Sequence, residues 1–158
     1  MDGWTWEDAT LKHPSGLNLT WPSMRLDFRK SAKKKEKEQR EFYNKSVREL
    51  DLLIRDVRAY HHRKNAKERK AEHKQKSDLR LESMIPFIIF KEPIHIKANN
   101  VRQINAAVDW ATKHDLNIVI VGGGDAWRIS KTLVEKNIPV ILLGCLLYTS
   151  DAADERNS

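Results

Sequence analysis

The chain has 158 residues, about the length of one domain, and a formal net charge of +7 at pH 7. Its single cysteine, Cys145, excludes a disulfide scaffold and a cysteine-based zinc cluster. The longest apolar stretch, residues 138–147, is much shorter than the roughly 20 residues of a membrane-spanning helix, and residues 1–4 do not start a signal peptide. We therefore expect no membrane partner.

Residues 1–30 are rich in aromatic side chains and in turn-forming residues. Trp4, Trp6 and Trp21 lie among two prolines and two glycines without a regular period. The pattern predicts an irregular segment with at most a short hairpin. Because indole rings are costly to leave in water, we expect them to pack on a partner surface or to line a pocket whose other walls lie outside this chain.

Residues 31–80 form a predicted basic helical insertion. Residues 29–76 carry 18 Lys and Arg against 8 Asp and Glu. Apolar residues recur at steps of four and three, which predicts one buried face of a long helix whose charges are solvated. They are Tyr43, Val47, Leu50, Ile54 and Val57. Residues 63–76 hold no large apolar residue, and we expect them to be exposed or frayed.

The same basic block leaves a second interpretation open. A small α/β binding module with a basic helix can contact nucleic acid or another polyanion. The apolar stripe on the helix, and the lack of aromatic residues among the charges of residues 64–76, argue against nucleic acid as the partner.

Residues 81–144 follow an alternating strand and helix pattern. Strands are predicted at residues 94–98, 118–121 and 138–143, and residues 83–90 are compatible with a further strand or with the end of a helix. Asn100 with Gln103 predicts the capped start of a helix, and Lys113 and His114 suit its negative end. Its predicted apolar face consists of Ile104, Ala107, Val108 and Ala111. Because a helix joins successive strands, we expect an α/β fold with three to four parallel strands.

Polar residues at the end of the first of these strands are the best candidates for chemistry. His95, Lys97 and Asn99 point to one face, because alternate side chains of a strand share a face. A buried parallel strand is usually apolar on both faces, so these residues stand out. Two plainer interpretations remain: His95 can be a hydrogen-bonded core histidine, and Lys97 can extend its ammonium group to the rim of the sheet.

The turn Gly122-Gly123-Gly124-Asp125 follows the second strand. Its backbone amides at a helix start can hold an anion, so a noncatalytic domain that binds a phosphorylated ligand is a further interpretation. Trp127 replaces the third glycine of the dinucleotide-binding motif. A tight turn or a close approach to substrate is favoured instead, and we expect Asp125 to cap the helix that follows.

A family resemblance adds to this interpretation. Residues 93–144, PIHIKANNVRQINAAVDWATKHDLNIVIVGGGDAWRISKTLVEKNIPVILLG, resemble metal-dependent amidohydrolases of the imidazolonepropionase-like group. Residues 2–22, DGWTWEDATLKHPSGLNLTWP, and the long basic helix are similar to the substrate-side insertions of bacterial members. The resemblance implies part of a (β/α)8 barrel that hydrolyses amide-like C–N bonds of a small amide or peptide-like substrate, with divalent metal, zinc above all, activating water.

Carried onto this sequence, the resemblance implies a site that departs from the family pattern. No H-x-H pair occurs in the chain, and Lys97 stands where the family usually has a histidine. We expect His95 as a metal ligand, Lys97 as the catalytic residue, and Asn99, Gly123 and Asp125 as substrate-binding residues. Lys97 is either a carbamylated metal bridge or a simple cation.

Residues 145–158 are predicted to be foreign to the protein. Residues 145–155, CLLYTSDAADE, resemble the translation of a transposon-end sequencing adapter, which predicts that native sequence stops near Gly144. We therefore expect an internal fragment of a larger hydrolase that is inactive alone. No compartment or oligomeric state follows from the sequence.

Overall fold

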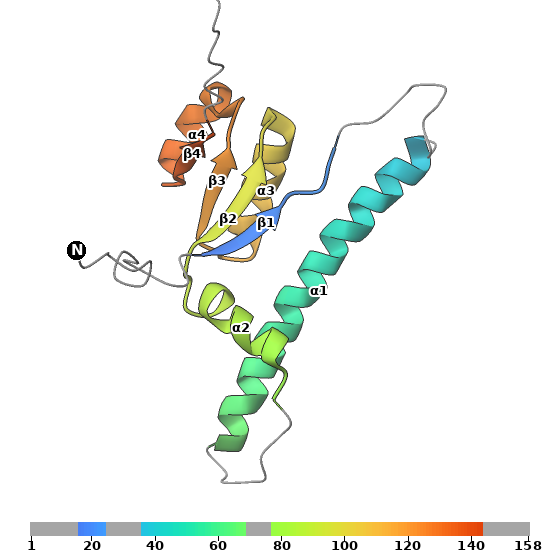
Figure 1. The fold of residues 1–158 in the computed structure, drawn as a ribbon, viewed down its shortest axis with the longest axis vertical. Coiled ribbons are helices and arrows are strands. Elements are labelled where there is room, and N and C mark those ends of the chain that lie inside the picture. The colour runs from blue at the N-terminus through green and yellow to red at the C-terminus, as the bar shows by residue number, and fades with distance from the viewer. Residues whose placement is uncertain (1–15, 25–35, 69–76, 144–158) are drawn as a thin grey trace, which may run out of the picture.

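The computed structural model describes residues 16–24, 36–68 and 77–143 (Figure 1). The elements, in chain order, are β1 (Leu17–Thr20), α1 (Glu36–Glu68), α2 (Leu79–Ile88), β2 (Ile94–Ala98), α3 (Val101–Lys113), β3 (Ile118–Gly122), the 3-10 helix η1 (Ala126–Ile129), α4 (Ser130–Glu135) and β4 (Val140–Leu142). The four strands are parallel and lie in the order β1-β2-β3-β4. The α/β class and the parallel sheet predicted from the sequence are confirmed.

The strands place alternate residues on two very different faces of the sheet. In register, Ile96 of β2 lies between Leu19 of β1 and Ile120 of β3. Ile96 and Ile120 are fully buried. The helices pack against this apolar face. Side chains of β1, β2, α1, α2 and α3 jointly line a cavity of about 90 Å³ there. The core of the described chain therefore lies between the sheet and its helices.

Strand β1 differs from the irregular segment expected for residues 1–30. Leu17–Thr20 pairs with β2 along its whole length, and the Trp21 amide donates to the Lys97 carbonyl at 3.1 Å. Trp21 is buried against Trp110 of α3, with ring centroids 5.6 Å apart. Only five residues lie between Gly16 and Pro22, and the alternation they carry is too short to predict a strand without its partner. The long-range pairing with β2 supplies the hydrogen bonds.

Helix α1 confirms the predicted long amphipathic helix. Of the apolar stripe, Ile54 and Val57 are buried, while Val47 and Leu50 pack at the edge of the core. The helix continues to Glu68, and of residues 63–66 all but Lys64 are exposed, as expected. Some of its charged side chains form exposed ion pairs, such as Lys45 with Glu49. Polyanion binding by this surface stays a prediction.

Helix α2 settles the open alternative for residues 83–90 in favour of a helix. It begins at the cap residue Asp78, whose carboxylate accepts from the amides of Arg80 and Leu81, and it buries four apolar side chains. Pro86 lies in its last turn. Lys64 of α1 pairs with Glu82 of α2, which holds the two helices together beside β1.

Helix α3 matches its predicted boundaries and buried face. The Asn100 side chain accepts from the Gln103 amide at 2.9 Å, which confirms the predicted cap. Gln103 Oε1 in turn accepts from Asn100 Nδ2 at 3.0 Å and from the Asn99 amide at 3.4 Å. The buried face consists of the predicted residues and Trp110: Ile104, Ala107, Val108, Trp110 and Ala111. This face holds α3 against β2 and β3.

Some predictions fall on residues outside the described ranges. These are the packing of Trp4 and Trp6, the fraying of residues 69–76, and the foreign origin of residues 145–158. Within the described ranges, no helix is long and apolar enough to cross a membrane.

Candidate functional site

The candidate site is the sheet face opposite the helices. Its side chains come from alternate positions of all four strands. Across the sheet they are Asn18, Thr20, His95, Lys97, Val119, Val121 and Ile141. Each is at least partly exposed, and the helices with described contacts pack on the other face. The structure therefore confirms that His95 and Lys97 share a face, and it adds Asn18 and Thr20 beside them.

His95 lies in the middle of β2, between Asn18 of β1 and Val119 of β3 in register. Its imidazole is half-buried and lies directly over the backbone of Gly16. A methyl group on Gly16 would come within 2.9 Å of His95 Cε1 and 3.2 Å of Nδ1. The glycine thus makes room for the ring, and the ring is positioned by close packing at the start of β1.

Lys97 lies nearer the carboxyl end of β2, beside Thr20 and Val121. Its side chain is exposed, and within the described ranges its ammonium group has no ion-pair partner. An exposed, unpaired ammonium group beside a hydroxyl can attract a carboxylate or a carbonyl oxygen. Both the catalytic role and the plainer interpretation of a rim lysine remain compatible with this position.

Asn99, Gly123 and Asp125 meet where β2 and β3 end. The Gly123 amide donates to the Ala98 carbonyl, and the Asp125 amide donates to the Asn99 carbonyl, both at 2.9 Å. Gly122 and Gly123 have φ of 100° and 58°, which favour glycine. A methyl group on Gly122 would overlap the Asn99 side-chain oxygen. The structure therefore brings these predicted residues together as an interlocked pair of loops.

The prediction that Asp125 caps its own helix is wrong. Its side chain makes no cap hydrogen bond to η1, and Oδ2 instead accepts from the Val101 amide at 3.2 Å, at the start of α3. The carboxylate thus accepts a hydrogen bond from one of the backbone amides that have no partner within the first turn of a helix. Its negative charge also opposes anion binding at this turn, which weakens the phosphate interpretation of Gly122 to Asp125.

The described residues do not by themselves form a metal centre. Structural and catalytic zinc sites need three or four nitrogen, sulfur or oxygen donors around the ion. Within the described ranges, no group of three or more His, Cys, Asp or Glu residues could hold one. On the sheet face opposite the helices, called the open face below, the neighbours of His95 are Asn18, Val119 and Lys97. The donor set therefore does not fit a zinc ion.

Sequence reasoning missed Asn18 and Thr20 as parts of this face. The signal was the alternation Leu-Asn-Leu-Thr at residues 17–20, in which apolar residues point to the helices and polar residues point away. Residues 94–98 alternate in the same way. A comparison of the two segments would have indicated that residues 17–20 form a strand whose polar side chains point to the same face as His95 and Lys97.

Comparison with known proteins finds one similar architecture. The chain resembles the crystal structure of an amidohydrolase from Thermotoga maritima MSB8, with a TM-score of 0.70 and 22% sequence identity over 92% of this chain. The chain spans 37% of the length of that protein. No family model and no curated protein matches the sequence. At this identity the likeness establishes the fold: the parallel sheet and its helices correspond to part of an amidohydrolase chain.

Proposed function

We propose that this chain is part of a barrel hydrolase that cleaves amide-like C–N bonds. The observation that carries the proposal is the likeness of most of the chain to about a third of an amidohydrolase, together with a parallel sheet whose described helices all pack on the same face. When such a sheet closes into a (β/α)8 barrel, the helix-free face becomes the interior. His95 and Lys97 then point inward, and Lys97 lies near the carboxyl ends of the strands, where such enzymes have their active sites.

The residues of the open face suggest roles that do not depend on groups outside this chain. The Lys97 ammonium can bind a substrate carbonyl or carboxylate oxygen, and Thr20 can donate to the same oxygen from the adjacent strand. The imidazole of His95 can accept or donate a proton deeper in the barrel. Since the described donors do not complete a metal site, we derive no step through a metal.

The exposed apolar surface beside β4 supports a partial barrel. Leu142 is 70% exposed and Val134 is 77% exposed, next to a surface hollow that Trp127 also lines. A parallel sheet is normally buried on both faces and paired at its edges. The neighbouring strands and helices of a larger protein would cover this surface, and we propose that the isolated chain is inactive.

The uninterrupted gene that contains this segment provides the test. We expect its protein to hydrolyse members of a panel of cyclic amides, N-acyl amino acids and dipeptides. Lys97→Met and His95→Asn should each lower kcat/KM by about 100-fold or more. Lys131→Met and His62→Asn remove the same side-chain types from exposed helix positions and serve as matched controls. These controls should stay within twofold of the parent.

Two outcomes would contradict the proposal. If the intact, folded protein hydrolyses no amide of this panel, the proposal that it is an amide hydrolase is wrong. If the 158-residue chain alone, with zinc added, hydrolyses an amide, the proposal that it is an inactive part of a larger barrel is wrong. Preference for a cyclic amide over the other substrates would support the imidazolonepropionase-like group, whereas preference for dipeptides would place the specificity elsewhere in the superfamily.

A further inference from the structure

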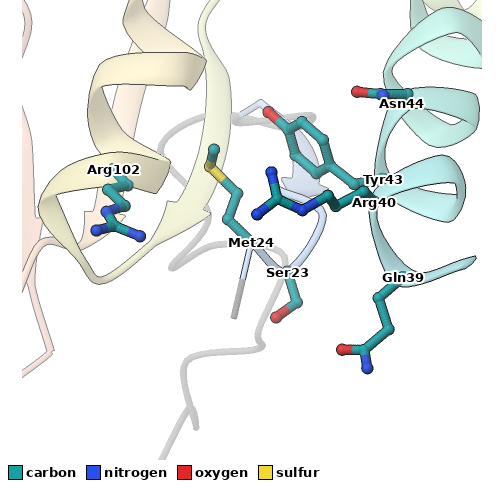
Figure 2. Close-up of a pocket in the computed structure, with 7 residues that line it drawn as sticks. All are labelled: Ser23, Met24, Gln39, Arg40, Tyr43, Asn44 and Arg102. Carbon is teal, nitrogen blue, oxygen red and sulfur yellow. The ribbon is translucent and has the colours of Figure 1, made fainter. Parts of the chain in front are cut away.

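A polar cavity lies on the helix side of the molecule, away from the open face. It has a volume of about 330 Å³ and lies between residues 23–24 after β1, the first described turns of α1 and the first turn of α3. Its lining residues are Ser23, Met24, Gln39, Arg40, Tyr43, Asn44 and Arg102 (Figure 2). This volume lies within the range of small-molecule sites.

The cavity is positively charged and rich in donors. Among the lining residues that the structure describes, two are arginines and none is acidic. Figure 2 shows the Arg40 guanidinium extending from α1 toward Met24, with Arg102 on the other side of Met24. In the part of the chain that the structure describes, the side chains of Tyr43, Asn44 and Arg102 have no hydrogen-bond partner. Tyr43, Asn44 and Arg102 thus line the cavity with donors that no group in the described ranges engages.

Arg40 is the one arginine of the pair with a partner. Its Nε and Nη2 donate to Glu36 Oε1 at 3.0 and 2.7 Å, in an exposed contact one helical turn away. Exposed ion pairs of this kind contribute little, so an anion of higher charge can compete for the same guanidinium. Glu36 therefore sets the strength of the site and does not close it.

We propose that this cavity binds the phosphate group of a small organic phosphate. A phosphate dianion can be held by two guanidinium groups at once, because each presents a planar fork of donors. The phenol of Tyr43 and the amide of Asn44 can reach further oxygens from α1. Met24 and the ring of Tyr43 offer apolar surface to the organic part of the ligand. The site is independent of the proposed hydrolase, since Lys97 and His95 lie on the opposite face of the sheet.

Calorimetric titration of the full 158-residue chain with inorganic phosphate and with phenyl phosphate, at low ionic strength, provides the test. We expect saturable binding with one site, tighter for phenyl phosphate. Arg40→Gln and Arg102→Gln should each weaken binding at least tenfold, while Glu36→Gln should strengthen it severalfold. Arg55→Gln makes the same charge change on an exposed part of α1 outside the cavity and should stay within twofold.

The variants are compared only after circular dichroism shows unchanged helix content. If Arg40→Gln does not fold, Arg40→Lys replaces it, with weaker binding expected because the fork is lost while the charge is kept. Three results would overturn the proposal: no saturable binding, equal weakening by Arg55→Gln, or benzoate binding as tightly as phenyl phosphate. The second would indicate general charge attraction, and the third a site for any anion. Lys97→Met should leave binding unchanged, whatever its effect on hydrolysis.

Discussion

A single carboxylate, Asp51, joins helices α1 and α3. Its two oxygens lie 2.9 Å from Trp110 Nε1, 2.7 Å from His114 Nε2 and 3.1 Å from Lys113 Nζ. The contact lies between residues about 60 positions apart in the sequence, and the Arg58 side chain adds a hydrogen bond to the His114 carbonyl at 2.6 Å. Partial burial raises the pKa of Asp51, but the hydrogen bonds from His114, Lys113 and Trp110 outweigh it, and the net pKa lies below the usual value.

This lowered pKa predicts that the chain loses stability in acid. A carboxyl group with a depressed pKa in the folded state contributes stability above its unfolded pKa, near 3.8, and loses it as pH falls through the folded value. We therefore expect the free energy of unfolding to decline below about pH 4, measured by urea denaturation. Asp51→Asn should reduce this dependence. Asp56→Asn, which removes an exposed carboxylate on the same helix, should retain it, and equal pH profiles for both variants would refute the role of Asp51.

At the scale of elements, the start of α3 is held by residues from two loops. Asn100, the residue directly before the helix, caps it with its side chain. The Asp125 carboxylate, from the loop after β3, accepts from the Val101 amide. The Asp125 amide in turn donates to the Asn99 carbonyl. The two loops at the carboxyl ends of β2 and β3 therefore stabilise one another, next to the open face with Lys97.

Removal of the Asp125 carboxylate is expected to loosen α3. Asp125→Ala should cost about 1 kcal/mol of unfolding free energy, because the Val101 amide loses its acceptor. Hydrogen exchange locates the effect: we expect faster exchange at Val101 and unchanged exchange at Ala126. The opposite pattern, with protection lost only in η1, would mean that Asp125 caps its own helix after all. Asp109→Ala, on the exposed side of α3, is the matched control.

At the scale of the whole molecule, the described sheet ends in two edge strands, β1 and β4, and β4 exposes large apolar side chains. β4 pairs with β3 only, and Ile141 and Leu142 are 46% and 70% exposed. Exposed apolar edge strands of this kind tend to pair with further chains. The helix side, by contrast, buries a continuous core that includes Ile54, Val57 and Ile104.

This asymmetry predicts self-association of the isolated chain. Sedimentation velocity should show association that rises with concentration, and Leu142→Lys should reduce it because a charge on an edge strand opposes pairing. Phe42→Lys changes a similarly exposed apolar residue on α1 and should have little effect. A monomer at all concentrations with a sharp, reversible thermal transition would contradict this expectation and weaken the partial-barrel proposal with it.

The sequence by itself determined the elements whose pattern is local. The apolar stripe of α1, the cap and buried face of α3 and the apolar run of β3 each depend on residues a few positions apart, so periodicity was enough to locate them. The shared face of His95 and Lys97 followed for the same reason, since strand alternation fixes the direction of side chains.

The tertiary structure alone decided what depends on distant partners. β1 exists as a strand because it pairs with β2, which lies beyond two intervening helices in the sequence. Asp125 serves α3 and not its own helix, and Asp51 binds the end of α3, because folding brings these groups together. Hydrogen bonds of this kind have no sequence period. They are specified only when the sheet and its helices assemble, and they determine where the candidate residues finally lie.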